Sequence, residues 1–324
     1  MQGLMTVFYK ELADHFNSWR GIILFITVLL VSIFATIGPS GALESIRAQL
    51  AEPVQYGFGR FAFLYLFTTA GEDLPSFLWF ITRFLVPIVG IVLGLDAINS
   101  ERNSGTLSRL LAQPIYRDAV INGKFLAGVV TIAIMLTTTI LIVSAIGLNV
   151  LGIAPSSGEI ARLLLFWGVS ILYGAFWLGL AMLFSVYFRS VATSAISTLG
   201  IWMFFSFFMS MAASLTANVL APMSQTPTTP ELLKNVGVQI TASRFSPIML
   251  FGEASTVLLA PGARTAAEML QLYHASGARW MPGPLTLGQS LLTIWPHLAT
   301  IGGLTALLFA ISYIRFMREE IRST

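Results

Sequence analysis

Six long apolar runs constrain this chain more than any other feature of its sequence. A helix needs about 20 mostly apolar residues to cross the hydrocarbon layer of a membrane. Such runs occupy residues 21–38, 77–97, 125–151, 160–187, 191–216 and 291–316. Each must be helical, because lipid offers no partner for open backbone N–H and C=O groups. The sequence therefore predicts an all-α membrane protein with six transmembrane helices in one domain over residues 1–324.

Composition excludes several other classes of protein. Only 10% of the residues are charged, against roughly 25% in a soluble domain. The net charge of +3 is too small to predict a nucleic-acid partner, and the absence of cysteine excludes disulfides and thiolate metal sites. The three histidines, His15, His274 and His297, show no metal-ligand spacing. We therefore expect no metal and no cofactor bound by this chain.

The basic residues of the short loops predict the orientation in the membrane. One side carries ten of them, namely Lys10, Arg20, Arg102, Arg109, Arg117, Lys124, Arg189, Arg315, Arg318 and Arg322. The short loops of the other side carry only Arg47, Arg60 and Arg162. Because basic loops stay in the cytosol, both termini are predicted to be cytosolic, and residues 39–76 and 217–290 extracytoplasmic. The acidic residues Glu11 and Asp14 before the first run favour a retained anchor over a signal peptide.

Three shorter apolar segments lie outside the predicted spans. In residues 4–19, apolar side chains recur every three or four positions, which predicts an amphipathic helix in the interface. Residues 61–70 are apolar but too short to cross, so they are predicted to be interfacial or packed. Ser246-Pro247 is an N-cap followed by proline at the first helical position, and Pro261-Gly262 ends the apolar run 247–259. That run is predicted to be a re-entrant or interfacial helix, preceded by a short helix over 231–240.

The cytosolic stretch 98–124 is the most polar part of the chain. The second span is expected to continue as helix to Arg102. Gly105, three residues further on, can break that helix. Residues 106–112 then form a short helix with leucines on one face, which Pro114 ends. A short, partly apolar helix of this kind suits docking into a groove on a cytosolic partner. The alternative is a solvated loop whose charges only fix the topology.

The same stretch resembles a known family. Glu101, Gly105, Thr106, Leu107, Leu110, Leu111, Pro114, Arg117 and the pair Gly123-Lys124 look like the segment between spans two and three of ABC-2-type permeases. The similarity is strongest to the nitrous-oxide-reductase maturation permease family. Lys10-Glu11-Leu12 is similar to the start of that family's N-terminal elbow helix. The six spans, the cytosolic termini and the segment before the last span follow in the same order, so the resemblance covers nearly the whole chain.

The resemblance implies the permease subunit of an ATP-driven transporter, usually an exporter, in the cytoplasmic (inner) membrane. A dimer of ATPase subunits would bind ATP and Mg, because no G-x-x-x-x-G-K-[ST] motif occurs in this chain. The region from Glu101 to Arg117, including Arg109, would dock on the ATPase, and Tyr187, Phe188 and Arg189 would form a second, smaller contact. A second permease chain, identical or not, would complete the pore, since six spans are half of the usual twelve.

Few polar groups lie at membrane depth, where ionisable residues usually mark function. Arg83 is a candidate substrate contact, although snorkelling to the outer headgroups explains it as well. Glu253 is a second candidate, or it forms a structural pair with Arg244, and His297 is expected at the interface in the first turn of the last span. The aromatic residues Phe204 and Phe208 either line a hydrophobic path or face lipid.

These residues form no relay of Asp, Glu and His. We therefore expect an apolar or amphipathic substrate. An ion-coupled carrier or channel without an ATPase is the alternative, and a membrane enzyme is a third reading. An enzyme would need a convergent catalytic set at membrane depth, which the spans do not supply.

Overall fold

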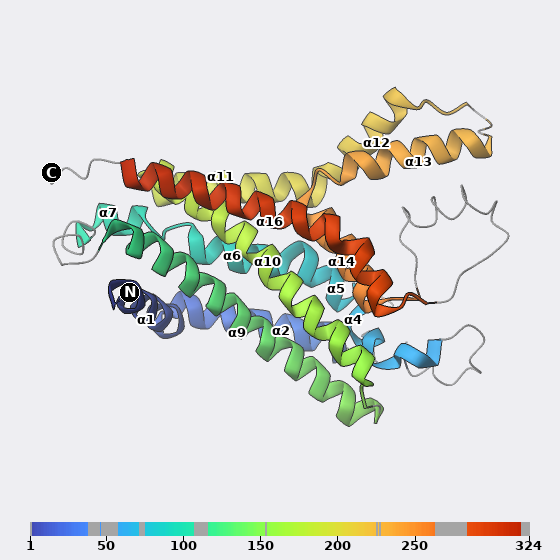
Figure 1. Cartoon of the computed structure of the whole chain (residues 1–324), viewed down its shortest axis with the longest axis horizontal. Helices are drawn as coiled ribbons and strands as arrows, with labels where there is room; N and C mark the ends of the chain where they lie inside the picture. The colour runs from blue at the N-terminus through green and yellow to red at the C-terminus, as the bar shows by residue number, and fades with distance from the viewer. Residues whose placement is uncertain are drawn as a thin grey trace.

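The computed structural model describes residues 2–37, 46, 58–70, 75–106, 116–152, 154–224, 226, 228–262 and 284–318. Every regular element in these ranges is helical, and six helices are long and apolar enough to cross a membrane (Figure 1). The predicted class, an all-α membrane protein with six spans, is confirmed. The start of the first helix and the end of the last lie at the same end of the bundle, which we call the terminal end (Figure 1).

The helices follow one another in a simple order along the chain. They are α1 (Gln2–Asn17), α2 (Trp19–Ile37), η1 (Phe58–Leu64), α4 (Tyr65–Thr68), α5 (Phe77–Phe80), η2 (Ile81–Leu85), α6 (Val86–Gly94), α7 (Asn99–Asn103), α9 (Arg117–Leu151), α10 (Ser157–Tyr187), α11 (Val191–Met203), η3 (Phe204–Phe208), α12 (Met209–Leu220), α13 (Thr229–Ser243), α14 (Pro247–Leu259) and α16 (Leu287–Arg318). The six spans are α2, α5 to α7, α9, α10, α11 to α12, and α16.

Helix α10 is the central helix of the bundle. It packs against α6, α9, α14 and α16, and its side chains Tyr173 and Trp177 are fully buried. A capping box between Ser156 and Glu159 fixes where it begins. Its approach to α6 needs glycine, because a Cβ on Gly90 would lie 2.7 Å from the carbonyl oxygen of Gly174. The hydrophobic core is thus built around a helix that touches most of the other spans.

The short apolar helices close the opposite end of the bundle. Helix α14 spans the residues expected for it, and Phe251 stacks on Tyr173 with ring centroids 4.2 Å apart. The segment expected to be interfacial or packed forms η1 and α4, whose residues Leu66 and Phe67 are fully buried. Both segments therefore pack against the spans. The interfacial position of α1 and the re-entrant path of α14 stay predictions, because the structure contains no membrane.

Two spans contain a π-helical turn, and the two turns lie side by side. In η2 the backbone carbonyl of Thr82 accepts a hydrogen bond from the Tyr173 hydroxyl (2.9 Å), and that of Arg83 accepts one from the Trp202 indole (2.8 Å). In return the Arg83 guanidinium donates to the carbonyl of Ser206 in η3. A π turn takes carbonyls out of the regular helical ladder, and here side chains of neighbouring helices supply their donors.

Some expected details differ from the structure. Span two continues to residue 103 with residues 99–103 helical, as expected, but a turn over residues 95–98 separates α6 from α7. Span three begins at Arg117 rather than at residue 125. His297 is not in the first turn of its helix; it lies about three turns into α16, is 8% exposed, and its Nε2 is 2.8 Å from Oε2 of Glu253, while its interfacial position stays a prediction. The expectation of a first-turn position was wrong because α16 begins earlier, at Leu287.

Candidate functional site

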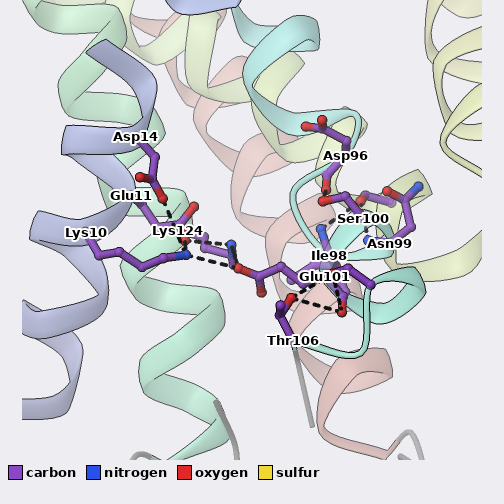
Figure 2. Close-up of polar contacts among 12 residues, drawn as sticks. Lys10, Glu11, Asp14, Asp96, Ile98, Asn99, Ser100, Glu101, Thr106 and Lys124 are labelled. Carbon is purple, nitrogen blue, oxygen red and sulfur yellow. Dashed lines mark hydrogen bonds and ion pairs between the residues drawn. The ribbon is translucent and has the colours of Figure 1, made fainter. Parts of the chain in front are cut away.

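Four charged side chains from three helices meet at the terminal end of the bundle (Figure 2). Lys124 of α9 is 4% exposed and its Nζ lies 2.8 Å from Oε1 of Glu11 and 2.9 Å from Oε1 of Glu101. Lys10, half exposed, adds contacts of 2.9 Å to Glu11 and 3.3 Å to Glu101. We call these residues the ion-pair cluster. It joins α1 and α7 through one buried ammonium group.

The environment of the cluster shifts the pKa of its members. Burial raises the pKa of Glu11, but Lys124 and Lys10 outweigh burial, so the pKa lies below its ordinary value of 4.5. Burial lowers the pKa of Lys10, but its carboxylate neighbours, chiefly Glu11 and Glu101, more than compensate and raise it above 10.5. Glu11 and Lys10 are therefore both charged near neutral pH.

The cluster predicts how stability depends on pH. Because the pKa of Glu11 is lowered on folding, its contribution is complete above pH 4.5, the unfolded value, and is lost as pH falls through the lower folded value. We expect the melting temperature of the purified protein to fall below about pH 4.5 more steeply than that of the Glu11→Gln variant. Thermal scans of both proteins between pH 3 and 7 measure this difference, and parallel curves would contradict it.

Helix α7 is held against the end of α10 by backbone contacts. The hydroxyl of Ser185 accepts hydrogen bonds from the backbone N–H groups of Ile98 (2.9 Å) and Asn99 (3.2 Å). The side chain of Asn103 donates to the carbonyl of Arg189 (2.9 Å). Ser185 thus fixes the start of α7 on α10, and Asn103 fixes its end on the turn between α10 and α11.

The predicted docking segment begins where α7 ends. Gly105 has φ +69°, a left-handed conformation that other residues adopt at a cost, and it ends the helix as predicted. The Thr106 hydroxyl bonds back to the carbonyl of Glu101 (3.3 Å). The next described residue is Tyr116, which is 83% exposed, and Arg117 begins α9. Five of the predicted docking residues lie outside the described ranges, namely Leu107, Arg109, Leu110, Leu111 and Pro114.

The second predicted contact lies beside the first. Tyr187 is half exposed, and the guanidinium of Arg315 at the end of α16 lies 5.5 Å from its ring centre. Phe188 stacks on Phe184 with centroids 5.7 Å apart. The carbonyl of Arg189 accepts the hydrogen bond from Asn103 described above. The structure therefore brings residues 101–106 and 187–189 together at one end of the molecule.

Among the residues predicted for a substrate path, Arg83 lies beside the π turn that carries Phe204 and Phe208, and Glu253 has other partners. Arg83 binds the Ser206 carbonyl and lies 5.7 Å from the ring centre of Trp79. Phe204 and Phe208 belong to the same π turn as Ser206, but about half of each side chain is exposed. Glu253 lies in α14, where it accepts hydrogen bonds from Arg244 (3.0 Å), as one of the two readings of the sequence had it, and contacts His297.

Sequence reasoning missed Arg162 as a structural residue. It was counted among loop charges, yet it is 2% exposed in α10 and its guanidinium donates to the carbonyls of Leu258 (3.2 Å) and Leu285 and to the hydroxyl of Ser290 (3.0 Å). Its only signal was its position, inside an otherwise apolar run. The partners come from segments far along the chain, so no local sequence pattern predicts them.

The fold and this site define a class of membrane protein with six spans and with short polar segments gathered at one end. The chain matches the model of the ABC-2 family transporter protein over residues 5–321. It therefore belongs to the ABC-2 family and is the membrane-spanning subunit of an ABC transporter.

Two named relatives agree with this assignment. Over 217 residues the chain is 30% identical to the probable ABC transporter permease protein NosY of Pseudomonas aeruginosa, covering 65% of this chain and 70% of that protein. It is 29% identical over 159 residues to the protein of the same name in Stutzerimonas stutzeri, covering 47% of this chain and 54% of that protein.

Proposed function

We propose that this subunit receives the movement of a separate ATPase through the segment 101–117 and the turn 187–189. The observation that carries the proposal is the hydrogen bond from Asn103 to the carbonyl of Arg189, which joins the two segments into one surface. A partner that pushes on this surface moves α7 and the end of α10 together. Because α10 packs against most other spans, that movement reaches the whole bundle.

The ion-pair cluster extends the same surface to α1. Glu101, at the base of the docking segment, is bound through Lys124 to Glu11. A buried pair of this kind resists separation, since parting its members leaves a charge without compensation. The base of the segment is thus anchored to α1, α9 and α10. A force applied to the segment would therefore be transmitted to these helices.

The transported substrate is proposed to be apolar or amphipathic and to be exported. Arg162, which is buried in α10, donates to backbone carbonyls and a hydroxyl, and the side chains of Glu253 and His297 contact each other. An arginine held by the fold in this way is not free to relay protons or to neutralise a charged solute. Direction follows from the resemblance to exporters, and the candidates Arg83, Phe204, Phe208 and Glu253 remain proposals for the path.

The complete transporter is proposed to contain two permease chains and two ATPase subunits in the cytoplasmic membrane. The ATPase subunits would bind ATP and Mg, and both ends of this chain would face the cytosol. The common position of α1 and the end of α16 at the terminal end supports that orientation (Figure 1). The spans α2, α11 to α12 and α16 leave most of their apolar surface exposed, which suits contact with lipid and with a second permease chain.

The proposal is tested by changing the tip of the docking segment. Replacing Leu107 by Asp puts a charge into an apolar contact, so we expect copurification of the ATPase with the permease to fall at least about tenfold. Arg109→Glu is expected to act in the same direction. The measurement is the ATPase recovered per permease from detergent extracts, together with the ATP turnover of the complex.

The matched control is Leu232→Asp. Leu232 lies in α13, away from the terminal end, and is 42% exposed, so the same change there should leave recovery and turnover unaltered (Figure 1). If Leu107→Asp and Arg109→Glu both behave like this control, residues 101–117 do not couple the ATPase.

A further inference from the structure

A cavity of about 470 Å³ lies between α1 and the adjoining ends of α2 and α6. Its volume falls within the usual range of ligand pockets, roughly 300–1,000 Å³. The ion-pair cluster forms one wall, so the cavity adjoins the proposed coupling surface (Figure 2). The proposed coupling to the ATPase does not require this cavity.

The lining changes from apolar to charged along the expected membrane normal. Leu24, Val92 and Leu93 come from within the spans and form the apolar wall. Trp19, which is 79% exposed, and Arg20 mark the start of span one, and aromatic and basic residues at such places lie at the level of lipid headgroups. A ligand that fits this gradient is itself apolar at one end and charged at the other.

The charges favour a headgroup that carries a cation. Four carboxylates line the cavity, those of Glu11, Asp14, Asp96 and Glu101, against three cations, Lys10, Arg20 and Lys124. Each of these cations already faces a carboxylate. Asp14 is the least occupied acid: it is 61% exposed, and its ion pair with Lys10 is long, at 3.5 Å. The lining therefore contains one more carboxylate than cations, and Asp14 is the carboxylate with the weakest ion pair.

Arg20 supplies the complementary feature. One of its nitrogens donates to Asp96, while the side chain is 74% exposed. A guanidinium has five N–H donors in a planar fork that suits phosphate oxygens. A phosphate beside Arg20 and an ammonium group at the carboxylate of Asp14 or Asp96 would both be satisfied, with acyl chains leaving along Leu24.

We propose that this cavity binds a phospholipid of the phosphatidylethanolamine class from the adjoining leaflet. The primary ammonium group donates three hydrogen bonds, which the surplus carboxylates accept, and the phosphate binds Arg20. A quaternary choline headgroup cannot donate these bonds. An anionic glycerol headgroup brings a negative charge to a wall that already has an excess of carboxylate. The bound lipid would fill the space between α1 and the spans.

The test measures the lipid selectivity of the full-length permease. Purified protein in detergent is titrated with phosphatidylethanolamine, phosphatidylcholine and phosphatidylglycerol of the same acyl chains, and binding is read by native mass spectrometry. We expect phosphatidylethanolamine to bind about tenfold more tightly than either competitor, as charge-assisted hydrogen bonds imply. In the variant Asp14→Asn with Asp96→Asn this preference should disappear and phosphatidylglycerol should bind more tightly.

Three further variants keep the test decisive. Arg20→Gln should weaken all three lipids, because it removes the phosphate contact, and Ala97→Phe should do the same by filling the cavity that Ala97 lines. Asp118→Asn, at the start of α9 and outside the lining, should leave the selectivity unchanged. If the double variant does not fold, the exposed Asp14→Asn change alone should lower the preference severalfold.

Two outcomes overturn the proposal. The first is equal binding of the three lipids to the unaltered protein, or a preference for phosphatidylglycerol, which would make the site one for anionic lipid. The second is a phosphatidylethanolamine preference that survives both carboxylate changes. Neither outcome bears on the ATPase copurification described above, so the two proposals fail separately.

Discussion

Replacing Lys124 by Met is expected to destabilise the protein by about 3–5 kcal/mol, the usual cost of removing one partner from a buried ion pair. Lys124 is 4% exposed and its ammonium group lies between two carboxylates, Glu11 and Glu101. Without it both acids remain at the same place with only Lys10 near them. We expect α1 to separate from α7 and α9, with a lower melting temperature and reduced transport.

Two controls separate this effect from a loss of packing. Lys10→Met removes a half-exposed partner of the same acids and should cost under about 1 kcal/mol. Adding Glu11→Gln and Glu101→Gln to Lys124→Met removes the uncompensated charges, so this triple variant should recover much of the stability. The chain has no cysteine, so a single cysteine at Val7, which is 2% exposed, reports separation of α1 by its labelling. Unchanged labelling and melting in Lys124→Met would contradict the role given to the cluster.

Replacing Arg162 by Leu is expected to loosen α14 and the start of α16. The guanidinium donates to carbonyls at the end of α14, where the helix dipole is negative, and to the hydroxyl of Ser290 in α16. Its loss leaves several buried acceptors without a donor, so we expect a cost of roughly 3 kcal/mol or more. Arg162→Lys keeps the charge but not the planar fork of N–H donors. Its stability should lie between that of the unaltered protein and that of Arg162→Leu.

A local probe distinguishes this from general unfolding. Ser255 of α14 is fully buried, and Ser255→Cys should react with a thiol reagent only when α14 moves. We expect faster labelling in Arg162→Leu at temperatures where the protein is still folded. Arg318→Leu, at the exposed end of α16, should change stability by no more than about 0.5 kcal/mol. Equal labelling rates in both variants would show that Arg162 does not hold α14.

The spans were predictable because each is a local signal. A run of apolar residues must become a helix in lipid wherever it occurs, and the Ser246-Pro247 cap places the start of α14 to the residue. The Gly105 break at the end of α7 followed from the same kind of local chemistry. Composition and periodicity thus account for the helices, but not for how they meet.

The contacts between distant segments were not predictable in this way. Glu11 and Lys124 belong to segments that resemble a known family, but nothing in either sequence neighbourhood indicates that they form a pair. Arg162 and Ser185 look ordinary along the chain and acquire their roles only when α14 and α7 pack on α10. A side chain's partner depends on the tertiary fold, whereas a helix in a membrane depends mainly on its own residues.

The paired π turns give each of the two spans one residue more than a regular helix would need to make the same turn. Deleting one residue from η2 would therefore restore regular helical geometry there and leave the preceding side chains nearly in phase with α6. What would change is the turn itself, because the carbonyls that Tyr173 and Trp202 satisfy would return to the helical ladder. The same deletion in the regular helix α6 would instead rotate the preceding side chains by about 100°. A single-residue deletion should therefore be tolerated better in η2 than in α6.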